Sequence, residues 1–161
     1  MNMIVAVDRQ WGIGKDNGLL ASLPGDMKYF KDKTLGKAVL MGRKTLESLP
    51  GQKGLPKREN FVMTSNENFE AERCEIIHDE QEVLDLIKKY GDDLFLIGGA
   101  TMYNKYYKLC DKLYITKIDA ILRADTFITN IDKDPNFKII SESEPIEEND
   151  LLYRFVVYKR G

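Results

Sequence analysis

The sequence predicts an α/β fold: a single domain with a central eight-stranded, mostly parallel sheet, four flanking helices and a C-terminal antiparallel hairpin at the edge of the sheet. Short apolar runs rich in β-branched residues alternate with segments of helical periodicity, which is typical of parallel sheets. The last two runs follow each other with no helix between them, which favours the hairpin. The chain has 161 residues, 43% of them hydrophobic, which suits one core, so we expect one domain over residues 1–161.

The individual elements follow from these patterns in chain order. Strands are expected at residues 3–7, 38–41, 60–63, 74–77, 94–97, 112–118, 137–141 and 153–158. Helices are expected at residues 24–33, 43–48, 80–90 and 100–107. Residues 9–23 and 50–59 show no regular pattern and are too long for plain connections, so we expect functional loops there.

Composition and charge exclude several classes of protein. The formal net charge of -2 argues against nucleic acid or an anionic membrane as partner, because a polyanion needs a basic face. No segment approaches the roughly 18 apolar residues of a membrane span, and the first residues, MNMIVAVDRQ, lack the basic start of a signal peptide. Cys74 and Cys110 lack CxxC spacing, so we expect free thiols and no metal site, and the single histidine, His78, is expected at the surface. We therefore expect a cytoplasmic protein, monomeric like most small domains without an exposed apolar helix.

Three glycines, Gly12, Gly14 and Gly18, follow the first predicted strand. They superficially match the dinucleotide-binding fingerprint, but in that motif the last glycine opens a helix and an acidic residue ends the next strand. Here the next helix begins only at Pro24, and the second strand ends at Met41. We therefore interpret this segment as a mobile, glycine-bearing lid.

Two strand-to-helix junctions are candidate anion sites, because a helix N-terminus offers unpaired N–H groups and a favourable dipole to a phosphate. One is VLMGRKT at 39–45, where a glycine is followed by two cations and a hydroxyl. The other is LFLIGGATMY at 94–103, with its Gly-Gly pair. Each junction alone also fits a plain turn. Together, with Thr64 and Ser65 ending the strand between them, they favour one extended polyphosphate ligand.

Asp26 is the most informative carboxylate. It lies in the first turn of a helix that begins at Pro24, so one interpretation is a helix cap. The other interpretation starts from the apolar face of this helix, Leu23, Met27 and Phe30, which Asp26 borders. A carboxylate beside apolar groups requires a polar partner, and a ligand with N–H donors in a cleft is one such partner.

Arg58 follows a proline-containing loop and precedes a strand. Such an arginine is usually a solvated surface charge. It also suits a clamp that holds a carboxylate by two parallel hydrogen bonds, and the sequence leaves both interpretations open.

A series of motifs runs along the chain in a specific order: IVAVDRQWGIGKDN, LPGDMKYFK, VLMGRKTLESLP, LPKREN, FVMTS, LFLIGGATMY, LYITKIDA and ADTF. Together they closely resemble dihydrofolate reductase nearly from end to end. The resemblance implies NADPH as cofactor and dihydrofolate as substrate. The hydride would pass from the nicotinamide to C6 of the pterin, with protonation at N5, to give tetrahydrofolate.

The resemblance also implies roles for substrate-site residues. Asp26 would accept hydrogen bonds from the pterin and favour protonation of N5, and Thr116 would orient its carboxylate, so these two are the expected catalytic residues. Arg58 would hold the glutamyl carboxylate of the substrate. The full expected substrate site is Met3, Val5, Ala6, Phe30, Leu49, Leu55, Arg58 and Thr116.

The cofactor would bind along the two junctions. Its phosphates would be held by Arg43, Lys44, Thr45, Thr64 and Ser65. The nicotinamide edge and pyrophosphate would lie against Ile97, Gly98, Gly99, Ala100, Thr101, Met102 and Tyr103, with a cis peptide bond between Gly98 and Gly99. The other expected cofactor contacts are Ala6, Ile13, Gly14, Gly18, Leu19 and Gly42.

Two positions depart from the family pattern. Where that pattern has leucine, proline and tryptophan in the lid, this chain has Leu19, Leu20 and Ala21, so the indole that normally orders a water beside the acid is missing. Ala124 stands where glycine is frequent before Asp125.

Two rival functions share parts of this pattern. A same-fold NADPH reductase of a ribityl-phosphate pyrimidine would need a phosphate clamp in place of Arg58. A non-catalytic nucleotide-binding module would have no need of Asp26 together with Thr116. The resemblance therefore favours dihydrofolate reduction.

Overall fold

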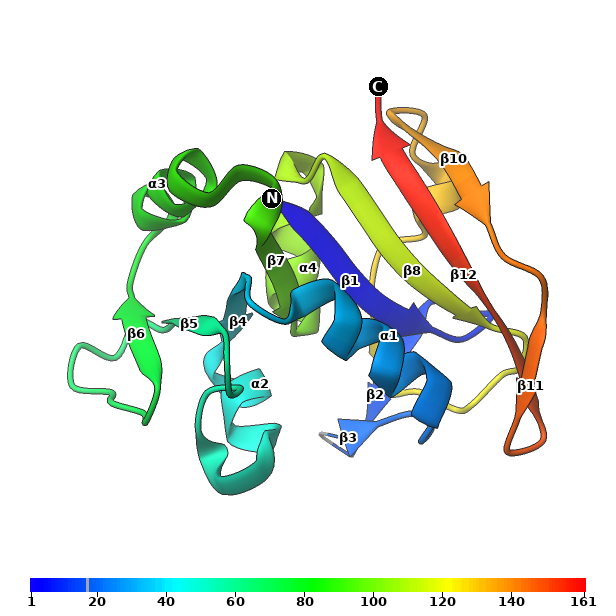
Figure 1. Cartoon of the computed structure of the whole chain (residues 1–161), viewed down its shortest axis with the longest axis horizontal. Helices are drawn as coiled ribbons and strands as arrows, with labels where there is room; N and C mark the ends of the chain where they lie inside the picture. Colours follow the sequence, from blue (N-terminus) through cyan, green and yellow to red (C-terminus); the bar gives the residue numbers. More distant parts are fainter. Residues whose placement is uncertain (17) are drawn as a thin grey trace.

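The computed structural model describes residues 1–16 and 18–161, and it has the expected α/β fold (Figure 1). Eight strands form the main path of the central sheet, in the order β10-β12-β8-β1-β7-β4-β5-β6. In that order their bounds are Phe137–Glu142, Leu151–Arg160, Lys112–Ile118, Asn2–Val7, Leu94–Gly98, Ala38–Gly42, Glu59–Met63 and Cys74–Ile77. A short additional strand, β11 (Ile146–Glu148), pairs with β12.

The strand directions agree with the expected hairpin. Strands β8, β1, β7, β4, β5 and β6 run parallel to one another. Strand β12 is antiparallel to β8 and to β10, so the C-terminal part of the chain adds an antiparallel edge to a parallel sheet. The predicted sheet and its C-terminal hairpin are therefore confirmed.

In the described part of the chain, four α-helices connect these strands: α1 (Pro24–Thr34), α2 (Arg43–Ser48), α3 (Glu80–Tyr90) and α4 (Ala100–Tyr106). Short 3-10 turns lie at Pro50–Gln52, Gly91–Asp93, Tyr107–Leu109 and Ile131–Lys133. In Figure 1, α1 crosses in front of the sheet and α4 lies behind it. Within the described residues, no helix is both long and apolar enough to cross a membrane.

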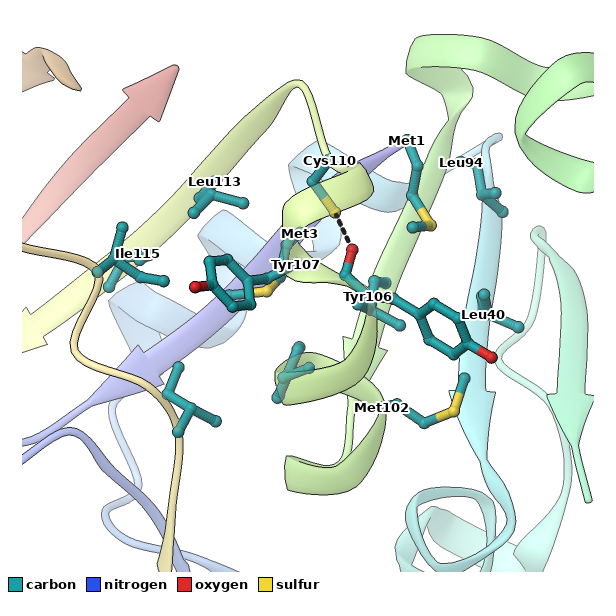
Figure 2. Packing of buried hydrophobic residues seen from close by; sticks show 14 of the residues in the cluster. Met1, Met3, Leu40, Leu94, Met102, Tyr106, Tyr107, Cys110, Leu113 and Ile115 are labelled. Atoms are coloured by element: carbon teal, nitrogen blue, oxygen red, sulfur yellow. Dashed lines mark hydrogen bonds between the residues drawn. The ribbon is translucent and has the colours of Figure 1, made fainter. Parts of the chain in front are cut away.

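The core lies on both faces of the sheet, because alternate residues of a strand point to opposite sides. On the α4 face, Met3 of β1 and Leu40 of β4 pack with Met102 and Tyr106 of α4 (Figure 2). On the α1 face, Ile4, Val39 and Met41 pack with Tyr29 and Phe30, which belong to α1, and with Leu46 of α2. The cysteines are free thiols, Cys110 buried and Cys74 partly buried.

The apolar face of α1 differs from the predicted one. Leu23 is buried and Phe30 is partly buried, but Met27 is 55% exposed. With 3.6 residues per turn, positions 29 and 30 lie on either side of position 26 around the helix, whereas position 27 is rotated about 100° from position 26. Tyr29 takes the place expected for Met27, and its ring stacks on Phe155 of β12 at 4.0 Å between centroids.

Residues 9–23 were expected to form an irregular loop, and of these residue 17 lies outside the described residues. Residues 9–16 and 18–23 are more regular than expected: they include β2 (Gly12–Lys15) and β3 (Gly18–Leu19), and β2 also pairs with β9 (Thr126–Phe127) in a second, three-stranded sheet. The backbone N–H of Asp125 donates to the carbonyl of Gly14 at 2.9 Å, and the Asp125 carboxylate accepts from the backbone N–H of Asp16 at 2.9 Å. Strands this short and rich in glycine show no apolar alternation, and their partner lies far along the chain.

Residues 50–59, the second expected loop, are held by a buried amide. Asn60, only 3% exposed, accepts from the backbone N–H of Leu55 at 2.8 Å and donates to its carbonyl at 2.9 Å. Leu55 is therefore fixed to the start of β5, because one side chain satisfies both of its backbone groups.

We expect Gly12→Ala to destabilise the fold by about 1 to 3 kcal/mol, the usual cost of overpacking. A Cβ at Gly12 would overlap the Cβ of Ala124, which precedes β9. Thermal or urea unfolding of the purified chain measures the loss. Because Ala124 supplies the clashing atom, Gly12→Ala combined with Ala124→Gly should regain most of it.

The control is Gly18→Ala on the neighbouring strand, where the nearest atom to a new Cβ is 3.6 Å away. That variant should stay within about 0.5 kcal/mol of the parent. A Gly12→Ala protein as stable as the Gly18→Ala protein would show that the β2–β9 contact is not tightly packed.

Candidate active site

The predicted anion junctions meet at one edge of the sheet. Strands β7, β4 and β5 are parallel neighbours, so their carboxyl ends lie together, as in other α/β folds where ligands bind at this edge. Gly98 ends β7 opposite Met41, and Gly42 ends β4 opposite Met63. Thr64 follows β5 directly. The topology thus assembles segments that are far apart in the sequence into one polar surface.

The Gly98–Gly99 turn closely approaches α2. The peptide bond between the two glycines is cis, as expected from the resemblance. Gly98 has φ of +137°, a conformation that suits glycine. A Cβ at Gly98 would lie 3.0 Å from the hydroxyl oxygen of Thr45, and one at Gly99 would lie 3.3 Å from the same oxygen. The two junctions therefore touch through Thr45 and form one cradle.

The cations of the first junction lie at the surface beside this cradle. Arg43 and Lys44 are exposed in the first turn of α2. The guanidinium of Arg43 lies 4.5 Å from the centre of the Phe69 ring, and its Nε lies 3.4 Å from Glu47. These contacts hold Arg43 loosely, since an exposed ion pair of this kind contributes at most about 1 kcal/mol.

The end of β5 adds further polar groups. Thr64 is partly buried and Ser65 is exposed. His78, which was expected at the surface, is exposed, and its Nδ1 lies 2.8 Å from the carbonyl oxygen of Thr64. His78 was not among the predicted site residues, and a lone histidine after a strand offers no pattern that would have placed it beside Thr64.

The remaining residues predicted to bind the cofactor differ in their exposure to solvent. Ile97, Gly99 and Ala100 are partly buried, Thr101 is exposed, and Met102 and Tyr103 are buried. In the segment expected to form the lid, Ile13 and Gly14 are partly buried, whereas Gly18 and Leu19 are exposed. Leu19 is 75% exposed, which leaves a large apolar side chain in solvent.

Tyr103 connects the cradle to β1. It is buried in α4, and its hydroxyl donates to the carbonyl oxygen of Ile4 at 2.8 Å. Burial raises the pKa of this phenol, so the group stays neutral and acts as a donor. Ile4 in turn packs in the same cluster as Phe30 of α1. The anion cradle and the helix that contains Asp26 are therefore joined through one residue of β1.

Asp26 does not cap its own helix. The residue before α1, Leu23, makes no side-chain cap, and the Asp26 carboxylate instead accepts a hydrogen bond from the hydroxyl of Thr116 at 2.6 Å. Thr116 lies in β8 and is only 1% exposed. The structure thus brings together the two residues that the resemblance pairs, and it excludes the cap interpretation of Asp26.

The surroundings of Asp26 favour its protonated form. Burial raises the pKa of the carboxyl above its usual value. The hydrogen bond from Thr116 acts in the opposite direction, and the negative charge of Glu148 adds to the increase. A carboxyl group of this kind, beside a partly apolar wall, is suited to a role in proton transfer.

The apolar wall beside Asp26 comes mainly from one cluster. Phe30, Leu49 and Leu55 are partly buried and pack against the cluster that contains Ile4. Ala6 is also partly buried, in a neighbouring cluster with Leu23, Ile118 and Tyr153. These residues lie on the α1 face of the sheet or beside it, where the substrate is expected from the sequence.

Met3 was wrongly assigned to this wall, and Ile4 was missed. Met3 is fully buried in the core on the α4 face (Figure 2), and Val5, partly buried, packs on that same cluster. Alternation along β1 places Ile4 and Ala6 on the other face. The two-residue period of the strand, counted back from Ala6, would have identified Ile4.

Arg58 is held at the far end of α1. Its Nε donates to the hydroxyl of Thr34 at 2.9 Å, and its Nη1 donates to the carbonyl of Pro56 at 2.8 Å. Partial burial lowers the pKa of the guanidinium, which stays charged. Thr34 follows Asp26 by eight residues, or roughly 12 Å along a helix. The site therefore has a carboxyl at one end of α1, a cation at the other and the ring of Phe30 between them.

Comparison with known proteins gives a consistent result. The dihydrofolate reductase family model matches residues 1–160. Dihydrofolate reductase of Bacillus subtilis (strain 168) is 36% identical over 162 residues, which cover 99% of this chain and 94% of that protein. The enzyme of Haemophilus influenzae is 34% identical over 160 residues, covering 99% and 98% of the two chains. A solved structure of dihydrofolate reductase from Enterococcus faecalis, complexed with NADP(H) and RAB-propyl, has a TM-score of 0.88 at 32% identity and covers 99% of this chain and 95% of that chain.

We expect Thr116→Val to raise the pKa of Asp26 further, because the hydrogen bond from Thr116 is the group that lowers it. The carbonyl-region NMR shift of the Asp26 side chain, followed against pH, measures this directly. Thr129→Val serves as the control, since that hydroxyl bonds Asn104 and not Asp26. An unchanged or lowered pKa in Thr116→Val would show that the 2.6 Å contact has no electrostatic effect.

Proposed function

The chain belongs to the dihydrofolate reductase family, and on this premise we propose that it reduces 7,8-dihydrofolate to 5,6,7,8-tetrahydrofolate at the edge of the sheet between Asp26 and the Gly98–Gly99 turn. It is an NADPH-dependent oxidoreductase. The single observation that most supports this site is the carboxyl of Asp26, hydrogen-bonded to Thr116 beside a partly apolar wall.

The residues at the strand ends fit NADPH. Their donor set combines exposed cations, hydroxyls and a backbone cradle that a Cβ at Gly98 or Gly99 would fill. Arg43, Lys44, Thr45, Thr64 and Ser65 would hold the phosphates, including the 2'-phosphate. The remaining contacts would come from Ala6, Ile13, Gly14, Gly18, Leu19, Gly42, Ile97, Gly98, Gly99, Ala100, Thr101, Met102 and Tyr103. When bound, NADPH supplies the hydride that reduces C6 of the pterin.

Asp26 orients the pterin and controls the protonation of its N5. The bond from Thr116 orients the carboxylate, whose remaining acceptor positions would meet the amino group and N3 of the ring. Because burial raises the pKa of Asp26, the carboxyl holds a proton to higher pH than an ordinary aspartate and favours protonation of N5. Ile4, Ala6, Phe30, Leu49 and Leu55 exclude water around the ring, whereas Val5, which was expected in this wall, packs on the α4 face.

Arg58 binds the other end of the substrate. Its contacts with Thr34 and Pro56 fix the plane of the guanidinium while its remaining N–H groups meet the glutamyl carboxylate. The separation of roughly 12 Å between the two ends of α1 suits a ligand with a ring at one end and a carboxylate at the other.

The same proposal includes the state of the protein in the cell. We propose that residues 1–161 form one domain that acts as a monomer in the cytoplasm and binds no nucleic acid. The net charge of -2 supports the absence of a polyanion partner, because such a partner requires a basic face.

We expect Asp26→Asn to lower the turnover of dihydrofolate at neutral pH by roughly 100- to 10,000-fold, the usual effect of losing a proton-transfer group. NADPH oxidation with dihydrofolate as acceptor measures turnover, and the same assay with NADH checks the choice of cofactor. NADPH affinity, measured by fluorescence titration, should stay near that of the parent.

The matched control for Asp26→Asn is Asp32→Asn, an exposed carboxylate on the same helix. That variant should turn over at the parent rate. Unchanged turnover in Asp26→Asn would remove the proposed role of Asp26.

We expect Arg58→Leu to raise the KM for dihydrofolate by roughly 10- to 150-fold, since a hydrogen bond to a charged group contributes about 1.5 to 3 kcal/mol. Arg58→Lys keeps the charge but loses the planar guanidinium, so its KM should lie between those of the parent and of Arg58→Leu. Lys53→Leu, at a partly exposed cation of the same loop that pairs with Glu72, serves as the control. A weakened affinity for NADPH with an unchanged KM for dihydrofolate would reassign Arg58 to the cofactor.

A further inference from the structure

The first turn of α1 is held by a carboxylate from the other end of the chain. Leu23, the residue before the helix, provides no side-chain cap. The backbone N–H of Gly25, which lies next to Asp26, donates instead to Oε1 of Glu148 at 2.9 Å, across 123 residues of sequence. Glu148 is the last residue of β11 and is partly buried. A distant residue thus satisfies a backbone donor that helix ends normally leave open.

Two further contacts fix Glu148 and its surroundings. Tyr153, in β12 and only 1% exposed, donates its hydroxyl to the same Oε1 at 3.2 Å. The side-chain amide of Asn149 donates to the carbonyl of Ser22 at 2.8 Å. The β11–β12 turn therefore holds the chain just before Asp26 through two hydrogen bonds, one at Gly25 and one at Ser22.

The absence of a side chain at Gly25 is what allows this approach. A Cβ at Gly25 would overlap the hydroxyl of Tyr153 and would lie 3.4 Å from both carboxylate oxygens of Glu148. The space beside the helix is thus already filled by the pair. Because the Glu148–Tyr153 pair packs this closely only against a residue without a side chain, the contact is a specific feature of the fold.

We propose that Glu148, held by Tyr153, is a positioning residue for the reaction: its carboxylate fixes the first turn of α1, from which Asp26 meets Thr116 and the pterin, and it places a second negative charge beside Asp26. The proposal rests on the proposed function of Asp26. Helix dipole and charge both favour this arrangement, since an acidic group is stabilised at a helix N-terminus.

Glu148 is the charged group among the titratable neighbours of Asp26. The others are Tyr29 of α1, Tyr103 of α4 and Tyr153 of β12, while Thr116 of β8 contributes a hydrogen bond. Burial raises the pKa of Tyr29 to about 12, and it also raises the pKa of Tyr103 and of Tyr153, so all three phenols are neutral near pH 7. The negative charge of Glu148 therefore adds to burial in raising the pKa of Asp26.

Two substitutions separate the charge from the contact. Glu148→Gln keeps an oxygen that accepts from Gly25 and removes the charge, so the pKa of Asp26 should fall while the helix start stays in place. Glu148→Ala removes both, so kcat should also fall, by roughly 10- to 100-fold, because small misplacements of a reacting group are costly. A role in stability alone would lower the unfolding temperature of Glu148→Ala and leave the titration of Asp26 unchanged in Glu148→Gln.

The test is an NMR titration of the Asp26 side-chain carboxyl in the full chain, with Glu147→Gln as the matched control. Glu147 is the exposed neighbour on the same strand, and its substitution changes the net charge equally. We expect the Asp26 pKa to fall in Glu148→Gln and to stay at the parent value in Glu147→Gln. In the pH profile of dihydrofolate reduction, the loss of rate with rising pH should then begin at lower pH in Glu148→Gln.

The proposal is overturned if Glu148→Gln leaves the Asp26 titration unchanged, or if Glu147→Gln shifts it equally. Because the titration needs no substrate, its result is valid even if dihydrofolate is not the hydride acceptor. If the pKa of Asp26 shifts but the pH–rate profile does not, the contact exists and the role of Asp26 in the reaction is the part that fails.

Discussion

Strand β1 is hydrogen-bonded in parallel to β8 on one side and to β7 on the other, and the geometry of the site depends on that double pairing. The register sets Ala6 opposite Thr116, which brings the threonine hydroxyl to Asp26. It also presents the carbonyl of Ile4 to Tyr103, which ties α4 to the strand. A slip of one residue would turn every side chain of β1 to the opposite face, so the pairing fixes both halves of the site together.

The second constraint is a carboxyl group beside apolar side chains. Burial alone makes such a group costly, and one hydrogen bond from Thr116 only partly offsets that cost. Placement in the first turn of α1 helps, because the helix dipole stabilises negative charge there. Glu148 uses the same end of the helix, and the two carboxyl groups affect each other. The result is an acid whose proton is held more firmly than usual.

Close approach between distant segments recurs around the site. The Cβ of Ala124 occupies the space that a side chain at Gly12 would need, and the Tyr153 hydroxyl occupies the corresponding space at Gly25. The first pair gives a reason for alanine at a position where the family often has glycine. With no side chain at Gly12, the methyl group of Ala124 fills the space between the two segments.

The sequence by itself determined the eight strands of the main path and the four helices, because their two-residue and 3.6-residue periods lie within short windows. The glycine junctions and Asp26 were visible as unusual residues at strand and helix ends, and the family resemblance assigned their roles and predicted the contact with Thr116. Only the tertiary structure turned Met27 to solvent and paired Gly12 and Gly14 with Phe127 and Thr126. It alone brought Glu148 to the start of α1. Such partners lie far apart, 123 residues in that last case, and a single side chain or a two-residue strand leaves no periodic pattern to detect.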